Sequence, residues 1–367
     1  LDELKTINNA TNGNITLSLP GTDLEGSTAD VKAALDGTIV NGYKGNITIS
    51  DQKDIAIQAV DLTTIRGATD GSVTVSNSIN INGTKDEVTA ALVSSKSKVS
   101  APTAQATITD KDGSPFNATD MSNIGKTTTG NVVVSNAVRI TGSTNELLAA
   151  LVSEETKVIA GKSRLVIQDE SNVQNFALID AKTSGPISYS LTDSTKNIND
   201  ATASQLEGAT HIKAQEIGTS TDGSVIDLDH VTTSSTIQSI SITGDSGSNQ
   251  VELSASLTDS SKTTIDFAND TVTDTIIFNT ADDSNFVTFN KDGSVNTSSG
   301  GPSALSFNKL RNFDFGNGTS SGAEDKFGIF YGSTHVFGPA IEITENSSSF
   351  AMALRDGIVY EDSFNSD

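Results

Sequence analysis

The sequence predicts a mainly β protein, a repeat solenoid of parallel strands with short helices at the corners. A pattern that starts at Gly26 returns at Gly83 and again at Gly142, at a nearly constant step, and such recurrence is typical of arrays. Alternating apolar–polar runs, typical of strands, occur twice in each repeat. Connections of about 29 residues between them are too long for hairpins and fit crossovers between parallel strands. We therefore expect a repeat of about 58 residues with two coils each.

Charge and composition limit the partners. The 367 residues include 46 acidic and 23 basic ones, so the chain carries a charge of −23, which disfavours nucleic acid and anionic lipid. Two interpretations of this charge stay open: a solvated acidic surface, or binding of divalent cations. The absence of cysteine excludes disulfides and thiolate metal sites. No apolar run is long enough for a membrane-spanning segment.

The N-terminal residues read as the end of an earlier repeat. Leu1, Leu4 and Ile7 have helical spacing, and the chain opens without an initiator Met or a signal peptide. We therefore expect a processed product or a segment of a longer protein. The next alternating run, residues 15–19, predicts the first strand of the first full unit.

The recurring pattern itself predicts a short helix. Ser27 or Thr28 can cap the first copy, and an acidic residue in the first turn of each copy favours the helix dipole: Asp30, Glu87 and Glu146. One apolar face recurs in all three copies, so each helix must pack on another element to be stable.

The second half of each unit begins with another predicted strand, residues 46–51 in the first unit. Its final aspartate recurs at a constant step in the next two units, as Asp51, Asp110 and Asp169. Residues 59–65 follow as a second short helix or a corner, and a new unit starts at Thr69. Threonine and serine alternate with apolar residues in these strands, so one face of the sheet must contact water.

The organisation changes along the chain. We expect a repeat array over 1–219, with units at about 11–68, 69–128 and 129–184 and a degenerate one at 185–219. A tighter β-solenoid follows over 220–265. Twelve of the 14 phenylalanines lie at or after Phe267, which predicts an aromatic-rich all-β C-terminal domain at 266–367. Tandem small β-sandwich modules remain the alternative, although such modules usually need about 100 residues.

Carboxylates and amides suggest calcium sites. Two short stretches resemble the first half of a calcium loop, but the same letters also form common turns, so both interpretations stay open. Further on, aspartates cluster between Asp266 and Asp283 and need either spreading or bridging cations. The candidate calcium ligands are Asp110, Asp112, Asp266, Asp270, Asp274, Asp282, Asp283, Asn290 and Asp292.

No catalytic motif stands out. His211, His230 and His335 are the only histidines, and none lies in a metalloprotease or nucleophile-elbow pattern. The sequence therefore favours a protein that is not an enzyme. Right-handed β-solenoids also include polysaccharide-cleaving enzymes, which need carboxylates at fixed spacing. That alternative stays open, and so does a phage tail fibre segment.

Several stretches resemble very large bacterial surface proteins, among them type I-secreted RTX-type adhesins, S-layer proteins and surface proteins of marine cyanobacteria. These stretches are the repeated helix pattern and 49–51, 191–198, 274–278, 310–315 and 325–329. The resemblance implies an extracellular location, calcium-supported folding and assembly at the cell surface. The calcium-binding nonapeptide of that group is absent, so the resemblance assigns no ligand.

Together these features predict a secreted, non-enzymatic structural protein of the cell surface: an S-layer, surface filament or adhesin component. We expect calcium stabilisation and self-association into a lattice or filament, because the exposed terminal coils of an array are natural stacking surfaces. Cell-surface polysaccharide is a further candidate partner, and a polysaccharide-binding or polysaccharide-cleaving β-solenoid is the alternative function.

Overall fold

The computed structural model describes residues 1–96, 99–215 and 237–244. Beyond these ranges it describes the backbone of several strands, and it describes side chains there only at 264–266. The chain forms two compact units. The first comprises Leu1–Asp169 and Gln174–Ser188, and the second comprises Glu170–Val173 and Tyr189–Asp367.

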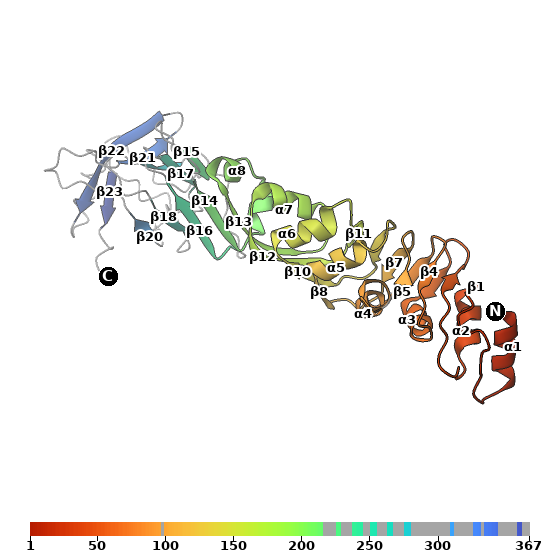
Figure 1. Ribbon diagram of the computed structural model, residues 1–367. Helices are drawn as coiled ribbons and strands as arrows, with labels where there is room; N and C mark the ends of the chain where they lie inside the picture. Colours follow the sequence, from red (N-terminus) through yellow and green to blue (C-terminus); the bar gives the residue numbers. More distant parts are fainter. Residues whose placement is uncertain are drawn as a thin grey trace. The chain divides into compact units, whose positions relative to one another are not determined.

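Short helices and short strands alternate through the first unit (Figure 1). The helices are α1 (Asp2–Ala10), α2 (Thr28–Leu35), α3 (Ala59–Gly67), α4 (Lys85–Val88), α5 (Ala118–Gly125), α6 (Thr144–Leu147) and α7 (Val173–Asp180), with π-helical turns η1 (Thr89–Val93) and η2 (Leu148–Val152). The strands are β1 (Leu24–Gly26), β2 (Ile47–Ile49), β3 (Ala56–Gln58), β4 (Val73–Val75), β5 (Asn80–Gly83), β6 (Val99–Ser100), β7 (Gln105–Ile108), β8 (Pro115–Asn117), β9 (Val132–Val134), β10 (Arg139–Gly142), β11 (Val158–Ile159) and β12 (Arg164–Ser171).

Strand pairing among the described strands of the first unit is parallel. One sheet has the order β1-β2-β4-β6 and a second the order β3-β5-β7-β9-β11, and β10 lies between β8 and β12. Residues that pair across these strands are 23 to 26 positions apart, as in Leu24↔Ile47 and Ile47↔Val73. The predicted parallel arrangement is confirmed, and the antiparallel pairs that sandwich modules would require do not occur among these described strands.

The paired spacing is shorter than the half unit that the sequence predicts. The difference arises because some half units contain two consecutive strands that belong to different sheets, and the short connection between them adds residues to the repeat but not to the distance between paired strands. β2 is followed by a short connection, 50–55, and then by β3, which pairs in a different sheet from β2. Residues 109–114 connect β7 to β8 in the same way. These connections carry the chain from one sheet to the next, and sequence periodicity alone does not separate the two steps.

The predicted alternation of buried and solvent-facing residues is confirmed. Ile47 and Ile49 are fully buried, whereas Thr48 between them is half-buried. Successive helices contact one another in a row from α1 to α6. Their apolar faces complete the core, for example through Leu62 on α3 and Val88 on α4. Burial of these side chains is the main stabilising contribution, at about 1.5–3 kcal/mol for each large apolar residue.

Sequence and structure disagree at the predicted strand 15–19. Only Ile15 pairs, in a single parallel bridge with Ile39. The partner segment turns away two residues later, because Asn41 and Gly42 both have positive φ, 63° and 70°. That left-handed turn ends the ladder before further pairs form.

The second unit continues with parallel strands. Its described elements are β13 (Ile187–Ser194), α8 (Thr195–Asn199), α9 (Ala203–Glu207), β14 (His211–Gln215), β15 (Val225–Leu228), β16 (Ser239–Thr243), β17 (Gln250–Ser254), β18 (Thr263–Asp266), β19 (Thr275–Asn279), β20 (Lys309–Arg311), β21 (Lys326–Tyr331), β22 (Thr334–Ile343) and β23 (Ile358–Glu361). β13, β14, β16, β18 and β20 pair in that order, and β15, β17, β19 and β21 form another parallel set. β22 then pairs antiparallel with β21 and parallel with β23.

These pairings bear on the expected organisation of the second unit. β18 pairs with β20, and β17 pairs with β19, so strands on the two sides of the expected boundary at residue 266 belong to the same sheets.

Among the helices that the structure describes, none is long and apolar enough to cross a membrane.

Candidate functional site

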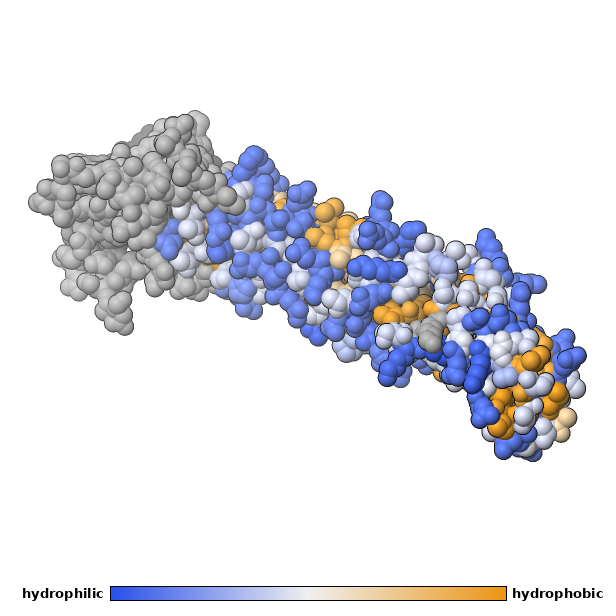
Figure 2. Space-filling model, in the orientation of Figure 1, coloured by the Kyte–Doolittle hydropathy of each residue, from blue (hydrophilic) through white to orange (hydrophobic). Residues whose placement is uncertain are grey.

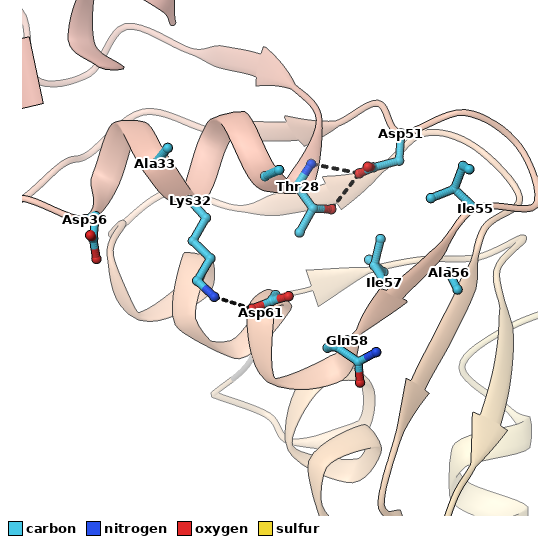
Figure 3. Close-up of a pocket in the computed structure, with 11 residues that line it drawn as sticks. Thr28, Lys32, Ala33, Asp36, Asp51, Ile55, Ala56, Ile57, Gln58 and Asp61 are labelled. Carbon is cyan, nitrogen blue, oxygen red and sulfur yellow. Dashed lines mark hydrogen bonds and ion pairs between the residues drawn. The ribbon is translucent and has the colours of Figure 1, made fainter. Parts of the chain in front are cut away.

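An open groove lies between α2, β3 and α3 in the first unit (Figure 3). It encloses about 540 Å³ and carries both apolar and charged side chains. Ile55 and Ile57 contribute the apolar part, and Asp36, Lys32 and Gln58 contribute polar groups. The sequence did not indicate this groove, because its lining comes from three elements that are separate in the chain and carry no shared motif.

Two side-chain contacts occupy much of the polar lining. The Lys32 ammonium forms an ion pair with the Asp61 carboxylate at 2.5 Å, which links α2 to α3. The hydrogen bond and charge of Asp61 raise the pKa of Lys32. At the other end of α2, Asp51 binds Thr28 (Figure 3). The groove therefore presents groups that already bind one another across adjacent helices.

The Asp51 contact belongs to a repeated device. Its carboxylate accepts hydrogen bonds from the backbone N–H of Thr28 at 2.8 Å and from the hydroxyl of that residue at 2.5 Å. A carboxylate at this place satisfies a backbone donor that a helix start leaves unpaired and also favours the helix dipole. The recurring aspartates at the ends of the second-half strands thus fix the helix of the preceding half unit.

We refer to Asp51, Asp110, Asp169 and Asp193 as the cap aspartates. Each accepts a backbone N–H at a helix start located 20 to 25 positions earlier in the chain. The donors of the last three are Lys85 at 2.6 Å, Thr144 at 2.6 Å and Val173 at 3.0 Å. The local caps predicted from the sequence are also present: Ser27 accepts the N–H of Asp30, and capping boxes join Thr84 to Glu87 and Ser143 to Glu146.

A second repeated contact joins neighbouring segments at a Thr-x-Gly sequence. In each copy the threonine hydroxyl donates to a backbone carbonyl of the preceding segment and accepts the N–H of the glycine that follows the next residue. A Cβ on that glycine would lie 2.2 to 2.3 Å from the same carbonyl oxygen, so only glycine fits. The three copies are Thr69 with Gly71, Thr128 with Gly130, and Thr183 with Gly185.

The structure places two of the predicted calcium ligands in structural contacts. Asp110 is a cap aspartate, and Asp112 accepts the backbone N–H of Ala137 at 2.8 Å. Gly113 between the two strands has φ of +78°, as a tight turn requires. The stretch that resembles a calcium loop forms the turn between β7 and β8, and calcium binding by this turn stays a prediction.

The remaining candidates are placed less fully. Asp266 ends β18 opposite Thr243, and its side chain is half-buried. The other six candidates lie outside the described residues: Asp270, Asp274, Asp282, Asp283, Asn290 and Asp292. Within the described part of the chain, no group of three or more histidine, cysteine or acidic side chains is close enough to hold a metal ion. The calcium sites stay predictions.

The histidines offer one contact of note. The Nδ1 atom of His211 lies 2.7 Å from the Ser239 hydroxyl, and both residues are in register on the neighbouring parallel strands β14 and β16. His211 is exposed, so the pair is a cross-strand hydrogen bond on a solvent-facing surface. His230 lies outside the described residues, and only the backbone of His335, in β22, is described.

Taken together, the repeated polar side chains of the first unit bind backbone groups of neighbouring segments. This arrangement fixes the spacing of successive strands and helices, which is a structural role. A search of protein-family models, of curated proteins and of solved structures finds no significant match to this sequence.

Proposed function

We propose that the protein is a secreted, non-enzymatic structural protein of the cell surface, in which successive segments stack as a solenoid. It would serve as a component of an S-layer, a surface filament or an adhesin. The observation that carries this proposal is the repeated use of polar side chains to join one segment to the next. Asp51 and Asp169 do this at helix starts, and Thr69 and Thr128 do it in the turns that precede β4 and β9.

This use of side chains supports a scaffold more than a catalyst. An enzyme directs reactive groups at a substrate, usually within a concave and largely apolar pocket. In this chain Asp51, Asp110 and Asp169 recur at a constant step, and their carboxylates contact backbone N–H groups of the chain itself. A contact that repeats at each step extends a structure without limit on its length, which suits coats and fibres.

Calcium stabilisation forms part of the proposal. The chain has 46 acidic and 23 basic residues, and the repulsion among the unpaired carboxylates opposes compact packing unless cations reduce it. Thermal melting of the chain in calcium and in chelator tests this part. We expect a higher melting temperature in calcium, with magnesium as the control for a general ionic effect. Equal melting temperatures in all three conditions would remove calcium from the proposal.

Location is the direct test of the function. Antibodies raised against the chain should label intact cells of the source organism as strongly as permeabilised ones. Electron microscopy of the labelled material should show ordered lattices or fibres. Label that appears only after permeabilisation would refute a surface protein. Release of sugars from cell-wall polysaccharide by the purified chain would instead favour the polysaccharide-cleaving alternative.

A further inference from the structure

The groove beside α2 has a counterpart in the next repeat of the chain. There α4, β8 and α5 take the places of α2, β3 and α3, in the same order along the chain. At the first helix start Asp51 accepts the N–H of Thr28 at 2.8 Å, and at the second Asp110 accepts the N–H of Lys85 at 2.6 Å. β3 and β8 are each the outermost of the described strands in their sheets. The two places can therefore be compared within one protein.

In the second of these places a lysine side chain fills the space. The Lys85 ammonium lies 5.8 Å from the centroid of the Phe116 ring on β8. It also lies 3.3 Å from a carboxylate oxygen of Asp120, which is in the first turn of α5, and 3.2 Å from one of Asp86. The side chain keeps only 21 % of its surface exposed. Its methylene groups cover the apolar strand residue while its charge meets the carboxylates, as long basic side chains do on mixed surfaces.

In the first place the same space is open. Thr28 takes the position of that lysine, and its hydroxyl bonds to Asp51 instead of reaching α3. Ile57 on β3 takes the position of the phenylalanine, and Asp61 is the acidic residue in the first turn of α3. All four side chains line the groove of about 540 Å³ (Figure 3). The groove therefore has the floor and the carboxylate of the filled place but lacks its lysine.

Charge and apolar surface in the groove both suit a lysine side chain. Three carboxylates line it: Asp36, Asp51 and Asp61. Lys32 alone among the lining residues is positively charged, and it reaches Oδ1 of Asp61 from one helical turn beyond Thr28, so Oδ2 of that carboxylate can accept from a second donor.

Apolar surface is also available to a ligand here. Ile55, at the edge of the groove, is 46 % exposed. Figure 2 shows that hydrophilic residues cover much of the described surface on the face drawn and that apolar residues gather in separate patches. A ligand with a cationic end and an apolar stem matches both parts of the groove.

We propose that the groove binds a lysine side chain of a partner protein, which takes the place that Lys85 fills in the next repeat. The methylene groups of the bound lysine lie over Ile57, and its ammonium donates to Oδ2 of Asp61. The net charge of −23 favours a partner with a basic surface. This partner is additional to the self-association and the polysaccharide considered above, and its binding does not require that the protein lie at a cell surface.

Nuclear magnetic resonance of the full chain, labelled at the isoleucine methyl groups, tests the proposal. The probe is Nα-acetyl-lysine N-methylamide, and Nα-acetyl-norleucine N-methylamide is its neutral control. We expect the signals of Ile55 and Ile57 to shift with the lysine probe alone, with a Kd of about 1 mM, as is typical of a ligand of this size. High salt should reduce the shifts. Tighter binding of pentylammonium than of the lysine probe would mean that the groove takes free amines, and would overturn a protein partner.

Three variants, each checked for folding by circular dichroism, connect the signal to the groove. Thr28→Lys supplies the missing lysine from the chain itself and should abolish the shifts, whereas Thr28→Ser keeps the hydroxyl and should bind as the parent does. Lys32→Met removes the competing ammonium and keeps an apolar stem, so it should strengthen binding about two- to fivefold.

The contrary results are equally specific. Equal shifts with the neutral probe would show that the carboxylates do not select a cation. Unchanged binding by Thr28→Lys, or binding by Lys32→Met that is no stronger than that of the parent, would place the probe outside the groove. Any of these results would overturn the inference, and none would alter the antibody labelling of intact cells.

Discussion

Substitution of Gly130 by alanine tests the Thr-x-Gly contact directly. The added methyl group would lie 2.2 Å from the carbonyl oxygen of Ala104 and 2.8 Å from its carbonyl carbon. Both atoms belong to the backbone, so no side-chain rotation relieves the overlap. The strands must separate, and the hydrogen bond from the Thr128 hydroxyl to the Ala104 carbonyl lengthens with them.

The expected cost follows from three contributions. Overpacking of this kind costs about 1–3 kcal/mol. Loss of the Thr128 hydrogen bond adds about 1 kcal/mol. Replacement of glycine by alanine restricts the unfolded chain and returns about 0.4–1 kcal/mol. We therefore expect a net loss of about 1–3.5 kcal/mol, which lowers the melting temperature of a unit of this size by about 2–14 °C.

Urea unfolding monitored by circular dichroism measures this loss. Gly161→Ala is the matched control, because a Cβ at Gly161 meets no atom within 4 Å and the residue has no positive φ. The control should change stability by less than about 1 kcal/mol, and in the stabilising direction. If the two variants unfold at the same urea concentration, the close approach at Gly130 does not hold the segments together and the reasoning is wrong.

Three further predictions concern other parts of the first unit. Asp110→Ala should cost about 1 kcal/mol in urea unfolding because it removes the acceptor of the Lys85 N–H at the start of α4, whereas Asp110→Asn, which keeps an acceptor oxygen, should cost less. Ile140→Ala should cost about 3–4 kcal/mol by the same assay, because the side chain is fully buried. Lys5 lowers the pKa of Asp30, and Asp30 raises the pKa of Lys5. The docking of α1 on α2 should therefore weaken when pH falls through the folded-state pKa of Asp30, and it should also weaken when pH rises through the folded-state pKa of Lys5. Hydrogen exchange of the α1 amides, corrected for intrinsic rates, measures this, and Asp30→Asn should remove the acid-side change.

Each of these predictions has a clear contrary result. Equal unfolding of the Asp110→Ala variant and the parent would mean that the carboxylate does not stabilise α4. A small cost for Ile140→Ala would indicate that the core around β10 is loosely packed. Exchange in α1 that is independent of pH would show that the ion pair with α2 contributes nothing to docking.

The position and type of most early elements could be predicted from the sequence. The helix that follows Ser27 and the strands 47–49 and 105–108 appear where their patterns placed them. Local rules were sufficient, because capping residues lie within three positions of the groups they bind and strand alternation has a period of two. The strand expected at 15–19 failed for a tertiary reason, since its partner segment turns away at Asn41.

The site could be predicted only in part. Asp51 and Asp110 drew attention as a repeat with a fixed step, but their partners, Thr28 and Lys85, lie 23 and 25 positions away in sequence. The residue pattern around Asp112 is typical of both a tight turn and a calcium-binding loop, because both need side chains with oxygen atoms beside a glycine. The groove beside Lys32 had no sequence signal at all.

The sequence by itself determined the repeat, the alternation and the helix starts of this protein, because these depend on residues close together in the chain. Only the tertiary structure decided which strand pairs with which, how the connections 50–55 and 109–114 move the chain between sheets, and which backbone groups the aspartates bind. Those features depend on contacts between residues some 25 positions apart, whose register follows from how whole segments pack rather than from any one residue type.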